Sequence, residues 1–439
     1  MVTPVTASSP GEGLRLHRWY DREVLGVGLA AMAGGFGQFG AVAALGDVAK
    51  SFGQITVTHG AAVGSLAEQA GLSGTVLGAG LAIIRLASLG GLPVAAMADR
   101  LGRRRVLLWS LGAGLALTAL AAASPGYWWF VAIFAIGRPM LSGADAVCQV
   151  MAAEQTDRHN RALGVAIVAA GYGIGAGLTA LLHTVGMAGL GFRGLFALAV
   201  VPLAGLLAIR RWVTEPDRFT REMADRAGAG TAAGEPPLPV IGAVGRRFRK
   251  RLGIVALLAF SLSVITGPAN GFVFLYADNL LHQPGYVTAV MVLGAGLSGF
   301  VGLLIGRWMA DHVGRRPTGT VGMAGLAGFG VLAYSGSSGE LAAGYVLGVL
   351  FGSILAPAVG AMVNELFPTA VRASVSGWWI AAGVAGAAAG LLTFGAVADV
   401  GDRFGLAAAV TFTPAAAAAG LFWLLPETRD REPEQLTAI

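Results

Sequence analysis

The chain has 439 residues, of which 55% are hydrophobic and only 12% are charged. Soluble domains carry about 25% charged residues, so this composition excludes a water-soluble globule of this size. The formal net charge of +6 would suit a nucleic-acid-binding protein, but the positions of the basic residues argue against that class.

Apolar segments that are long enough to cross a membrane follow one another along the chain. A helix needs about 20 apolar residues to span the hydrocarbon core, and it satisfies its own backbone hydrogen bonds where water is absent. Twelve such segments cover residues 23–46, 72–97, 105–123, 126–152, 162–186, 194–212, 253–281, 286–308, 318–335, 341–363, 373–398 and 404–425. We therefore predict an all-α polytopic membrane protein with twelve transmembrane helices.

The basic residues mark the two sides of this predicted membrane protein. With the N-terminus placed inside, most of the 30 Lys and Arg residues fall in the tails and inner loops, and only Lys50, Arg193 and Arg403 fall in outer loops. This asymmetry follows the positive-inside rule and places both termini in the cytoplasm. The polar residues 1–22 contain no apolar core with a cleavage site, so we expect no signal peptide. We predict a multi-pass protein of the cytoplasmic membrane that contacts lipid and binds no nucleic acid.

Charged motifs recur in the two halves of the chain at one nearly constant separation. MADRLGRRR (97–105) follows the second apolar segment, and MADHVGRRP (309–317) follows the eighth. A Glu and a later Arg follow the fourth and tenth segments, and a further Glu follows the sixth and twelfth. The repeated residues are Asp99, Arg103, Glu154, Arg161 and Glu215 in the first half, and Asp311, Arg315, Glu365, Arg372 and Glu427 in the second. The repeat predicts two six-helix bundles of the same orientation.

The repeat divides the chain into five predicted parts. They are a cytoplasmic tail (1–22), an N-terminal bundle (23–212), a cytoplasmic linker (213–250), a C-terminal bundle (251–426) and a second cytoplasmic tail (427–439). The linker is polar, rich in Gly and Pro and basic at its end, and we expect a short surface helix over 216–227.

These motifs resemble those of the major facilitator superfamily. MADRLGRRR is similar to its loop between helices two and three, and GRPMLSG (137–143) resembles the start of the fourth helix in sugar porters and their relatives. EQTDRHNR and ELFPTAVR resemble the motifs after helices four and ten, and EPDRF and PETRD resemble those that close each half. The resemblance covers the whole chain and is moderately specific for sugar-porter, organic-ion and metabolite–proton symporter branches. It implies a secondary transporter whose two bundles alternate around a central site.

The resemblance also implies that the repeated charges form a cytoplasmic gate. It places Asp99 near the start of the eleventh helix, close to Arg372, and by the repeat Asp311 near the start of the fifth, close to Arg161. A carboxylate is stabilised at the positive N-terminal end of a helix, so such contacts would hold the halves closed on the cytoplasmic side. The alternative is that the Arg clusters only anchor topology.

Few ionisable residues lie inside the predicted spans, and such residues are functional candidates because their burial is costly. Arg85 lies in the second span, and Arg138 and Asp145 lie in the fourth. In the fourth span, Arg138, Asp145 and Gln149 fall on one helical face. We expect Arg85 to attract an anionic substrate and Asp145 to exchange a proton or release Arg85; the alternative is a static Arg85–Asp145 ion pair. Arg138 fits a packing or coupling role better than direct substrate contact.

Other polar residues extend the candidate substrate site. The seventh span contains Gly267-Pro268, which can interrupt a helix beside a cavity, followed by Asn270 and Tyr276. These two loosely resemble polar residues of the seventh helix in sugar porters, but the paired Gln residues of hexose carriers are absent. Gln38 in the first span is a further candidate, in a segment where aromatic-acid symporters carry acidic residues.

The sequence offers little for other chemistries. The six His residues are scattered without metal-ligand spacing, and GYGIGAG (171–177) lies within a span rather than after a strand, which favours helix packing over nucleotide binding. We predict neither an enzyme nor a metal or cofactor site.

The predicted function is proton symport of a small solute, an organic anion or related metabolite, by a monomer that uses the proton gradient. Two alternatives stay open, namely a proton-coupled exporter of drugs or metabolites and an uncoupled facilitator. A transporter-like sensor is a third class.

Overall fold

The structure is a computed structural model that describes residues 16–53, 70–157, 161–185, 191–228, 248–400 and 403–429. The first half contains α1 (Arg22–Ala43), α2 (Leu45–Phe52), α4 (Gly74–Ala87), η1 (Ser88–Gly90), α5 (Gly91–Leu101), α6 (Arg103–Ala121), α7 (Tyr127–Gln155), α8 (Arg161–Val185), α9 (Gly191–Ala197) and α10 (Val200–Ile209), followed by α11 (Asp217–Gly228). The second half contains α12 (Arg249–Gly271), α13 (Val273–Leu275), the π-helical turn η3 (Tyr276–Leu280), α14 (Gly285–His312), α15 (Arg315–Leu332), α16 (Ser338–Glu365), α17 (Thr369–Ala398), α18 (Phe404–Ala417) and η4 (Ala418–Leu424).

The predicted all-α membrane architecture is confirmed, since each of the twelve apolar segments falls on a helix or on consecutive helical pieces. Within the described ranges, eleven helices are long and apolar enough to cross a membrane. The remaining predicted span corresponds to α15, which has 18 residues and begins with two Arg residues and a Pro. Because of these residues, the mean hydropathy of α15 falls below that of the eleven other spans. Helix α11 occupies the stretch where a short surface helix was expected.

One span is interrupted for a reason that the sequence contains. The second span consists of α4 and α5, joined by the 3-10 turn η1. Pro93 lies in the first turn of α5 and has no backbone N–H, so it cannot donate to the carbonyl of Leu89 within η1. The interruption changes the rotation of α4 relative to α5, which affects where Arg85 points.

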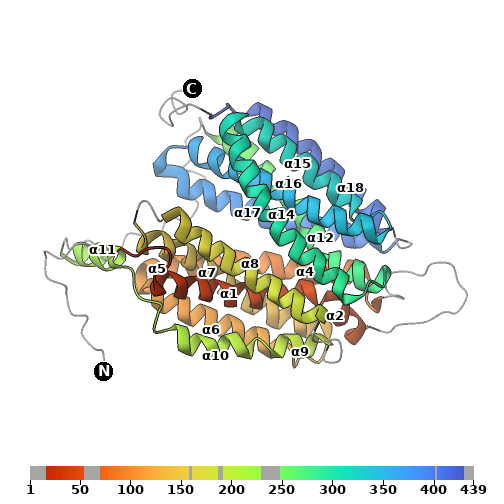
Figure 1. The fold of residues 1–439 in the computed structure, drawn as a ribbon, viewed down its shortest axis with the longest axis horizontal. Helices are drawn as coiled ribbons and strands as arrows, with labels where there is room; N and C mark the ends of the chain where they lie inside the picture. The colour runs from red at the N-terminus through yellow and green to blue at the C-terminus, as the bar shows by residue number, and fades with distance from the viewer. Residues whose placement is uncertain are drawn as a thin grey trace, which may run out of the picture.

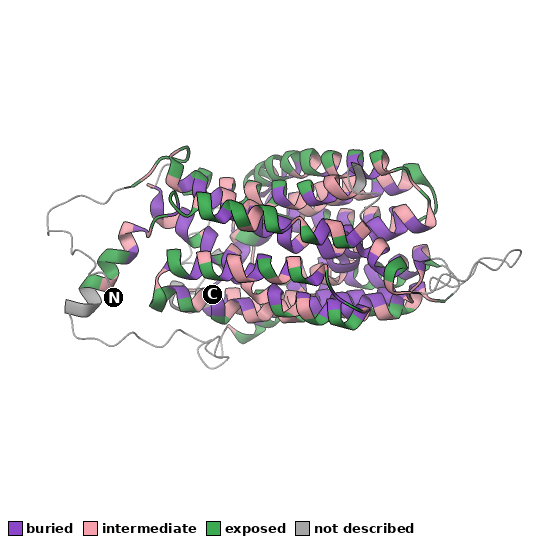
Figure 2. Cartoon of the chain, turned by 90° about the horizontal axis from the view of Figure 1, so that it is seen from below, coloured by how far each residue is buried: buried purple, intermediate pink, exposed green. Residues whose placement is uncertain are grey.

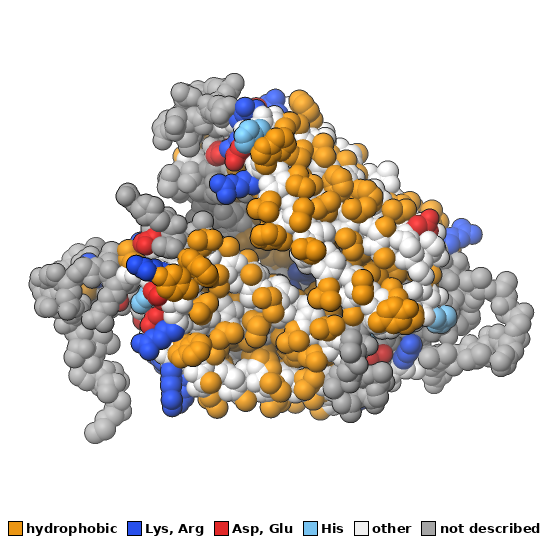
Figure 3. Space-filling view, in the orientation of Figure 1, with side chains coloured by type: hydrophobic (Ala, Val, Ile, Leu, Met, Phe, Trp, Pro, Cys, Tyr) orange, Lys and Arg blue, Asp and Glu red, His pale blue; other side chains and the backbone are white. Residues whose placement is uncertain are grey.

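The surface matches a protein that sits in lipid. Figure 3 shows hydrophobic side chains across the middle of the molecule, with charged side chains gathered at its two ends. On α14, Leu293, Leu297, Phe300 and Leu304 are all largely exposed and recur at helical spacing on one face. Figure 2 shows the same pattern of exposed outer faces and buried inner faces on the helices. A contiguous exposed apolar surface of this kind is the lipid-facing surface of a membrane protein.

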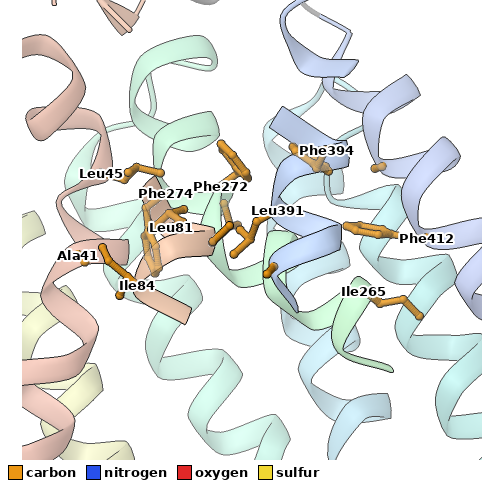
Figure 4. Close-up of a cluster of buried hydrophobic side chains, with 14 of the residues drawn as sticks. Ala41, Leu45, Leu81, Ile84, Ile265, Phe272, Phe274, Leu391, Phe394 and Phe412 are labelled. Atoms are coloured by element: carbon orange, nitrogen blue, oxygen red, sulfur yellow. The ribbon is translucent and has the colours of Figure 1, made fainter. Parts of the chain in front are cut away.

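The helices form two halves that meet at one end (Figure 1). We call the end that carries Leu16 and Arg429 the near end and the opposite end the far end. The halves converge toward the far end and diverge toward the near end. A hydrophobic cluster runs across the junction: Figure 4 shows Ala41, Leu45, Leu81 and Ile84 of the first half near Phe272, Phe274 and Leu391 of the second. The far end is therefore the closed end in this conformation.

Glycines bring equivalent helix pairs into backbone contact within each half. A Cβ at Gly35 of α1 would collide with the carbonyl of Tyr172 on α8, and one at Gly386 of α17 would collide with the carbonyl of Phe260 on α12. Small residues allow such close packing where lipid provides no hydrophobic driving force between helices. Glycines at such positions are therefore required for the close packing of these helix pairs.

Candidate functional site

Two equivalent charge clusters lie at the near end, one in each half. In the first, Arg103 pairs with Asp99 at 3.1 Å and forms an ion pair with Glu154. In the second, Arg315 lies 3.8 Å from Asp311 and 3.3 Å from Glu365. The repeated motifs of the sequence thus form repeated contacts in space. The first cluster connects the start of α6 to the ends of α5 and α7, and the second connects the start of α15 to the ends of α14 and α16. Each cluster lies within one half.

Glu215 and Glu427 bind backbone rather than arginine side chains. Glu215 accepts hydrogen bonds from the N–H groups of Arg103 (2.6 Å) and Arg104 (3.0 Å) at the start of α6. Glu427 accepts those of Arg315 (2.9 Å) and Arg316 (3.0 Å) at the start of α15. The first N–H groups of a helix have no partner within it, and its dipole favours an anion there.

The local backbone explains how these carboxylates reach the helix starts. The residues before α6 and α15 are glycines with positive φ, Gly102 at 96° and Gly314 at 125°, a conformation that other residues adopt with strain. Burial alone would raise the pKa of Glu427, but the hydrogen bonds from backbone N–H groups bring it below the ordinary value.

The near-end clusters stay within their own halves in this conformation. The Asp99 side chain is 60% exposed and that of Asp311 is 53% exposed. Arg161 is exposed at the start of α8, and the side chain of Arg372 lies outside the described residues. The predicted contacts of Asp99 with Arg372 and of Asp311 with Arg161 therefore stay predictions, which apply to a conformation closed at the near end.

A different carboxylate joins the halves at the far end. Asp399, after the last turn of α17, accepts hydrogen bonds from the backbone N–H groups of Gly74 and Thr75 (2.8 Å for Thr75) and from the Thr75 hydroxyl (2.5 Å). Gly74 and Thr75 begin α4 of the other half. Sequence reasoning missed this contact, because Asp399 belongs to no repeated motif.

The polar residues expected inside the membrane gather in the first half. Arg138 is buried on α7 and donates to the backbone carbonyl of Gln38 on α1 at 3.3 Å. Arg85, Tyr172 and Asp145 are close enough to Arg138 to interact with it electrostatically. Arg85 is exposed on α4, and Asp145 and Gln149 are half-buried on α7. Figure 3 shows the surface hollowed between the two halves, with a basic side chain at the bottom of the hollow.

Several buried polar atoms of this group lack a hydrogen-bond partner. They are Gln38 Nε2, Arg138 Nε and Asp145 Oδ1. Buried polar groups are nearly always hydrogen-bonded, so unpaired ones mark a place where a ligand or water belongs. Two of the three are donors, one of them on a cation, which is the complement of a small anion.

The static Arg85–Asp145 ion pair, which was the alternative to a functional role, is not among the ion pairs of the described residues. Asp145 instead interacts with Arg138, two turns earlier on the same helix. The structure therefore brings Arg85, Arg138 and Asp145 into one region with Arg138 at its centre.

The two candidates from the seventh span have other neighbours. Asn270 is half-buried and donates to the backbone carbonyl of Thr266 at 2.9 Å, within its own helix. Tyr276 is buried in an aromatic cluster, with its ring 5.0 Å from Phe404 and 5.1 Å from Tyr334. This packing accounts for the apolar part of Tyr276, and its predicted substrate contact stays a prediction.

Among the described residues, no group of three or more His, Cys, Asp or Glu could hold a metal ion. The single cysteine, Cys148, is buried.

Comparison with known proteins assigns the family. The Major Facilitator Superfamily profile matches residues 24–334 and 300–438. The chain belongs to the major facilitator superfamily. It is therefore a multi-pass membrane secondary transporter of small molecules and not an enzyme, as predicted.

Individual relatives show which transporters the chain resembles in sequence. The chain is 28% identical to the gallate transporter of Pseudomonas putida, over 81% of this chain and 84% of that one. It is 26% identical to the gentisate transporter of Corynebacterium glutamicum (75% and 74%) and 25% identical to a probable 4-methylmuconolactone transporter of Cupriavidus pinatubonensis (80% and 81%).

The fold is that of the inward-open xylose transporter XylE of E. coli, with a TM-score of 0.72 at 18% identity over 94% of this chain and 98% of that one. The human organic anion transporter MFSD10 matches with a TM-score of 0.61 at 17% identity, over 94% and 98%.

Proposed function

We propose that this transporter takes up a small organic carboxylate together with a proton. The observation that carries the proposal is the pair of arginines in the first half, buried Arg138 and exposed Arg85, beside unpaired donors of Arg138 and Gln38. Such donors in a low-dielectric region bind an anion more strongly than they would in water. Relatives named for gallate and gentisate transport support a carboxylate substrate.

The proposed coupling residue is Asp145. One of its carboxylate oxygens is buried without a partner, and it is close enough to Arg138 to interact with it. An anion bound at Arg138 would compete with Asp145 for the same positive charge, and a proton on Asp145 would relieve that competition. Substrate and proton would therefore bind cooperatively, as symport requires.

The proposed orientation puts the near end in the cytoplasm. Among the described residues, most Lys and Arg residues of the inner loops lie toward that end, and membrane proteins retain such residues inside. The conformation described here would then be open to the cytoplasm and closed to the outside.

An uncoupled facilitator is the second candidate. The residue of the first helix that contacts Arg138 is Gln38. Its side-chain amide does not titrate, so proton coupling would rest on Asp145 alone.

The test uses purified protein in liposomes with a pH-sensitive dye inside. Adding gallate, gentisate or shikimate outside should acidify the lumen, and Arg85→Gln should reduce the rate at least tenfold while the folded yield stays similar. Arg307→Gln is the matched control, because Arg307 is an exposed arginine on α14, in the other half. Uptake of labelled acid without acidification would indicate the facilitator. Equal activity of Arg85→Gln and wild type would refute the assigned anion site.

A further inference from the structure

A second group of ionisable residues lies at the far end, away from the proposed anion site. His183, in the last turn of α8, contacts Asp47 on α2 with 2.9 Å between Nε2 and Oδ2. The His183 side chain is only 10% exposed, and its other ring nitrogen is buried without a hydrogen-bond partner. The pair links α2 to α8 within the first half.

The second half approaches this pair through the π-helical turn η3. A Cβ at Gly46, next to Asp47, would lie 3.0 Å from the amide oxygen of Asn279 and 3.2 Å from its nitrogen, so the Asn279 side chain approaches the backbone of α2 closely. Asn279 is 3% exposed, and both of its amide atoms lack a partner. The preceding residue, Asp278, accepts a hydrogen bond from Thr288 at 3.4 Å and interacts electrostatically with both His183 and Asp47.

The charge balance of this group depends on the imidazole. Lys50 on α2 is the other charged residue that interacts with Asp47 and Asp278. Arg193 on the adjacent α9 is engaged elsewhere, since it donates to the carbonyls of Ala122 (2.8 Å) and Ser124 (3.1 Å). With His183 protonated, two positive and two negative charges balance; with His183 neutral, one negative charge is left in excess. Histidine is the side chain that ordinarily changes charge between about pH 5 and 8.

The carboxylate of the pair stays ionised near neutrality. Burial alone would raise the pKa of Asp47, but the hydrogen bond and charge of His183, together with Lys50, bring it below the ordinary value. Of the three ionisable side chains His183, Asp47 and Asp278, only the imidazole ordinarily changes charge near neutral pH.

We propose that His183, Asp47 and Asp278 form a proton site that closes the far end between the two halves. When the halves separate at this end, Asp278 leaves with the second half, and His183 keeps one carboxylate neighbour in place of two. The closed conformation therefore binds the proton more tightly, and protonation favours closure by the same factor. Loss of the proton leaves the excess negative charge at the interface and favours opening. This inference rests on alternating access but not on the identity of the substrate.

The experiment measures the distance between the halves at the far end without substrate. In a Cys148→Ala background, spin labels at Ala123→Cys after α6 and Ser338→Cys at the start of α16 report this distance in lipid nanodiscs. Both positions are exposed, one in each half. Lowering the pH from 8 to 5 should raise the ratio of the short to the long distance by about 5- to 150-fold, the usual range of such couplings.

The His183→Gln variant should lose most of this pH dependence, because glutamine keeps a polar side chain but cannot be protonated. His282→Asn is the matched control: His282 is an exposed histidine near the same end, and asparagine tolerates its positive φ. Asp278→Asn should also lose most of the pH dependence, because His183 then has Asp47 as its one carboxylate neighbour in both conformations. Thermal melting in the same nanodiscs checks that each variant is folded.

The same pH profile in wild type and His183→Gln would overturn the proton site. So would loss of the pH dependence in His282→Asn. Because no substrate is present, failure of acid uptake in liposomes with an intact distance profile would contradict the proposed function alone.

Discussion

Removing the Asp399 carboxylate should open the far end. In the variant Asp399→Ala, the start of α4 loses the acceptor for two backbone N–H groups and one hydroxyl, all of which belong to the other half. Removing a helix cap costs about 0.5–2 kcal/mol, and the interaction of a carboxylate with the helix dipole adds about 0.3–1 kcal/mol. Since the contact exists only when the far end is closed, its loss of about 1–3 kcal/mol falls on that conformation and lowers its population ratio about 5- to 150-fold.

The spin-label pair at Ala123 and Ser338 measures this shift directly, at one fixed pH. Asp399→Ala should move the distance distribution toward the long component, and Asp399→Asn should give an intermediate shift because it keeps an acceptor without the charge. Ser73→Ala is the matched control. The Ser73 hydroxyl caps the same helix start by accepting from Val76 N at 3.2 Å, but the bond lies within one half, so its loss should lower stability without changing the distances. Equal distributions for Asp399→Ala and Ser73→Ala would refute the reasoning.

Two further variants test the other carboxylates. Asp145→Asn should abolish the dependence of uptake on the pH gradient while exchange of labelled for unlabelled acid continues; retained proton-driven uptake would remove Asp145 from the coupling. Glu427→Ala should lower the free energy of unfolding by the cost of a lost helix cap, about 1 kcal/mol, and the thermal midpoint should fall with it. Because the pKa of Glu427 is lowered in the folded protein, its contribution is present above the ordinary carboxyl range and is lost as pH falls through the lowered value. The thermal midpoints of Glu427→Ala and wild type should therefore converge in acid. A difference that stays constant with pH would contradict the stabilisation of the start of α15 by the Glu427 carboxylate.

The sequence predicts the repeat well and its contacts less well. The equivalence of Glu215 and Glu427 follows from their positions after the last span of each half. Their partners could not be predicted, because a backbone N–H at a helix start leaves no trace in residue identity. The glycines before α6 and α15 are the only signal, and positive φ at Gly102 and Gly314 becomes informative once the helix starts are known.

The proposed anion site shows a second limit of prediction from the sequence. Arg138, Asp145 and Gln149 were correctly assigned to one helix, α7, since their spacing lies within an uninterrupted span. The position of Arg85 relative to them depends on η1, which breaks the helical phase between α4 and α5. The contact of His183, one of the six scattered His residues, could not be predicted for a related reason. Asp47 and Asp278 are distant from it along the chain, and only tertiary packing brings them close.

The two ends of the molecule use the same kind of contact in opposite conformations. The second span (α4 and α5) and α17 run antiparallel, and α4 packs against α17 at the far end, where Asp399 binds the start of α4. Asp99 ends the second span at the near end and is 60% exposed here, as expected for a carboxylate whose predicted partner, the start of α17, belongs to the conformation closed at the near end. Rocking of the halves would break one carboxylate–helix contact and form the other. The two free energies would then largely cancel, so that binding of a proton or a substrate, worth about 1–3 kcal/mol, is sufficient to decide which end is closed.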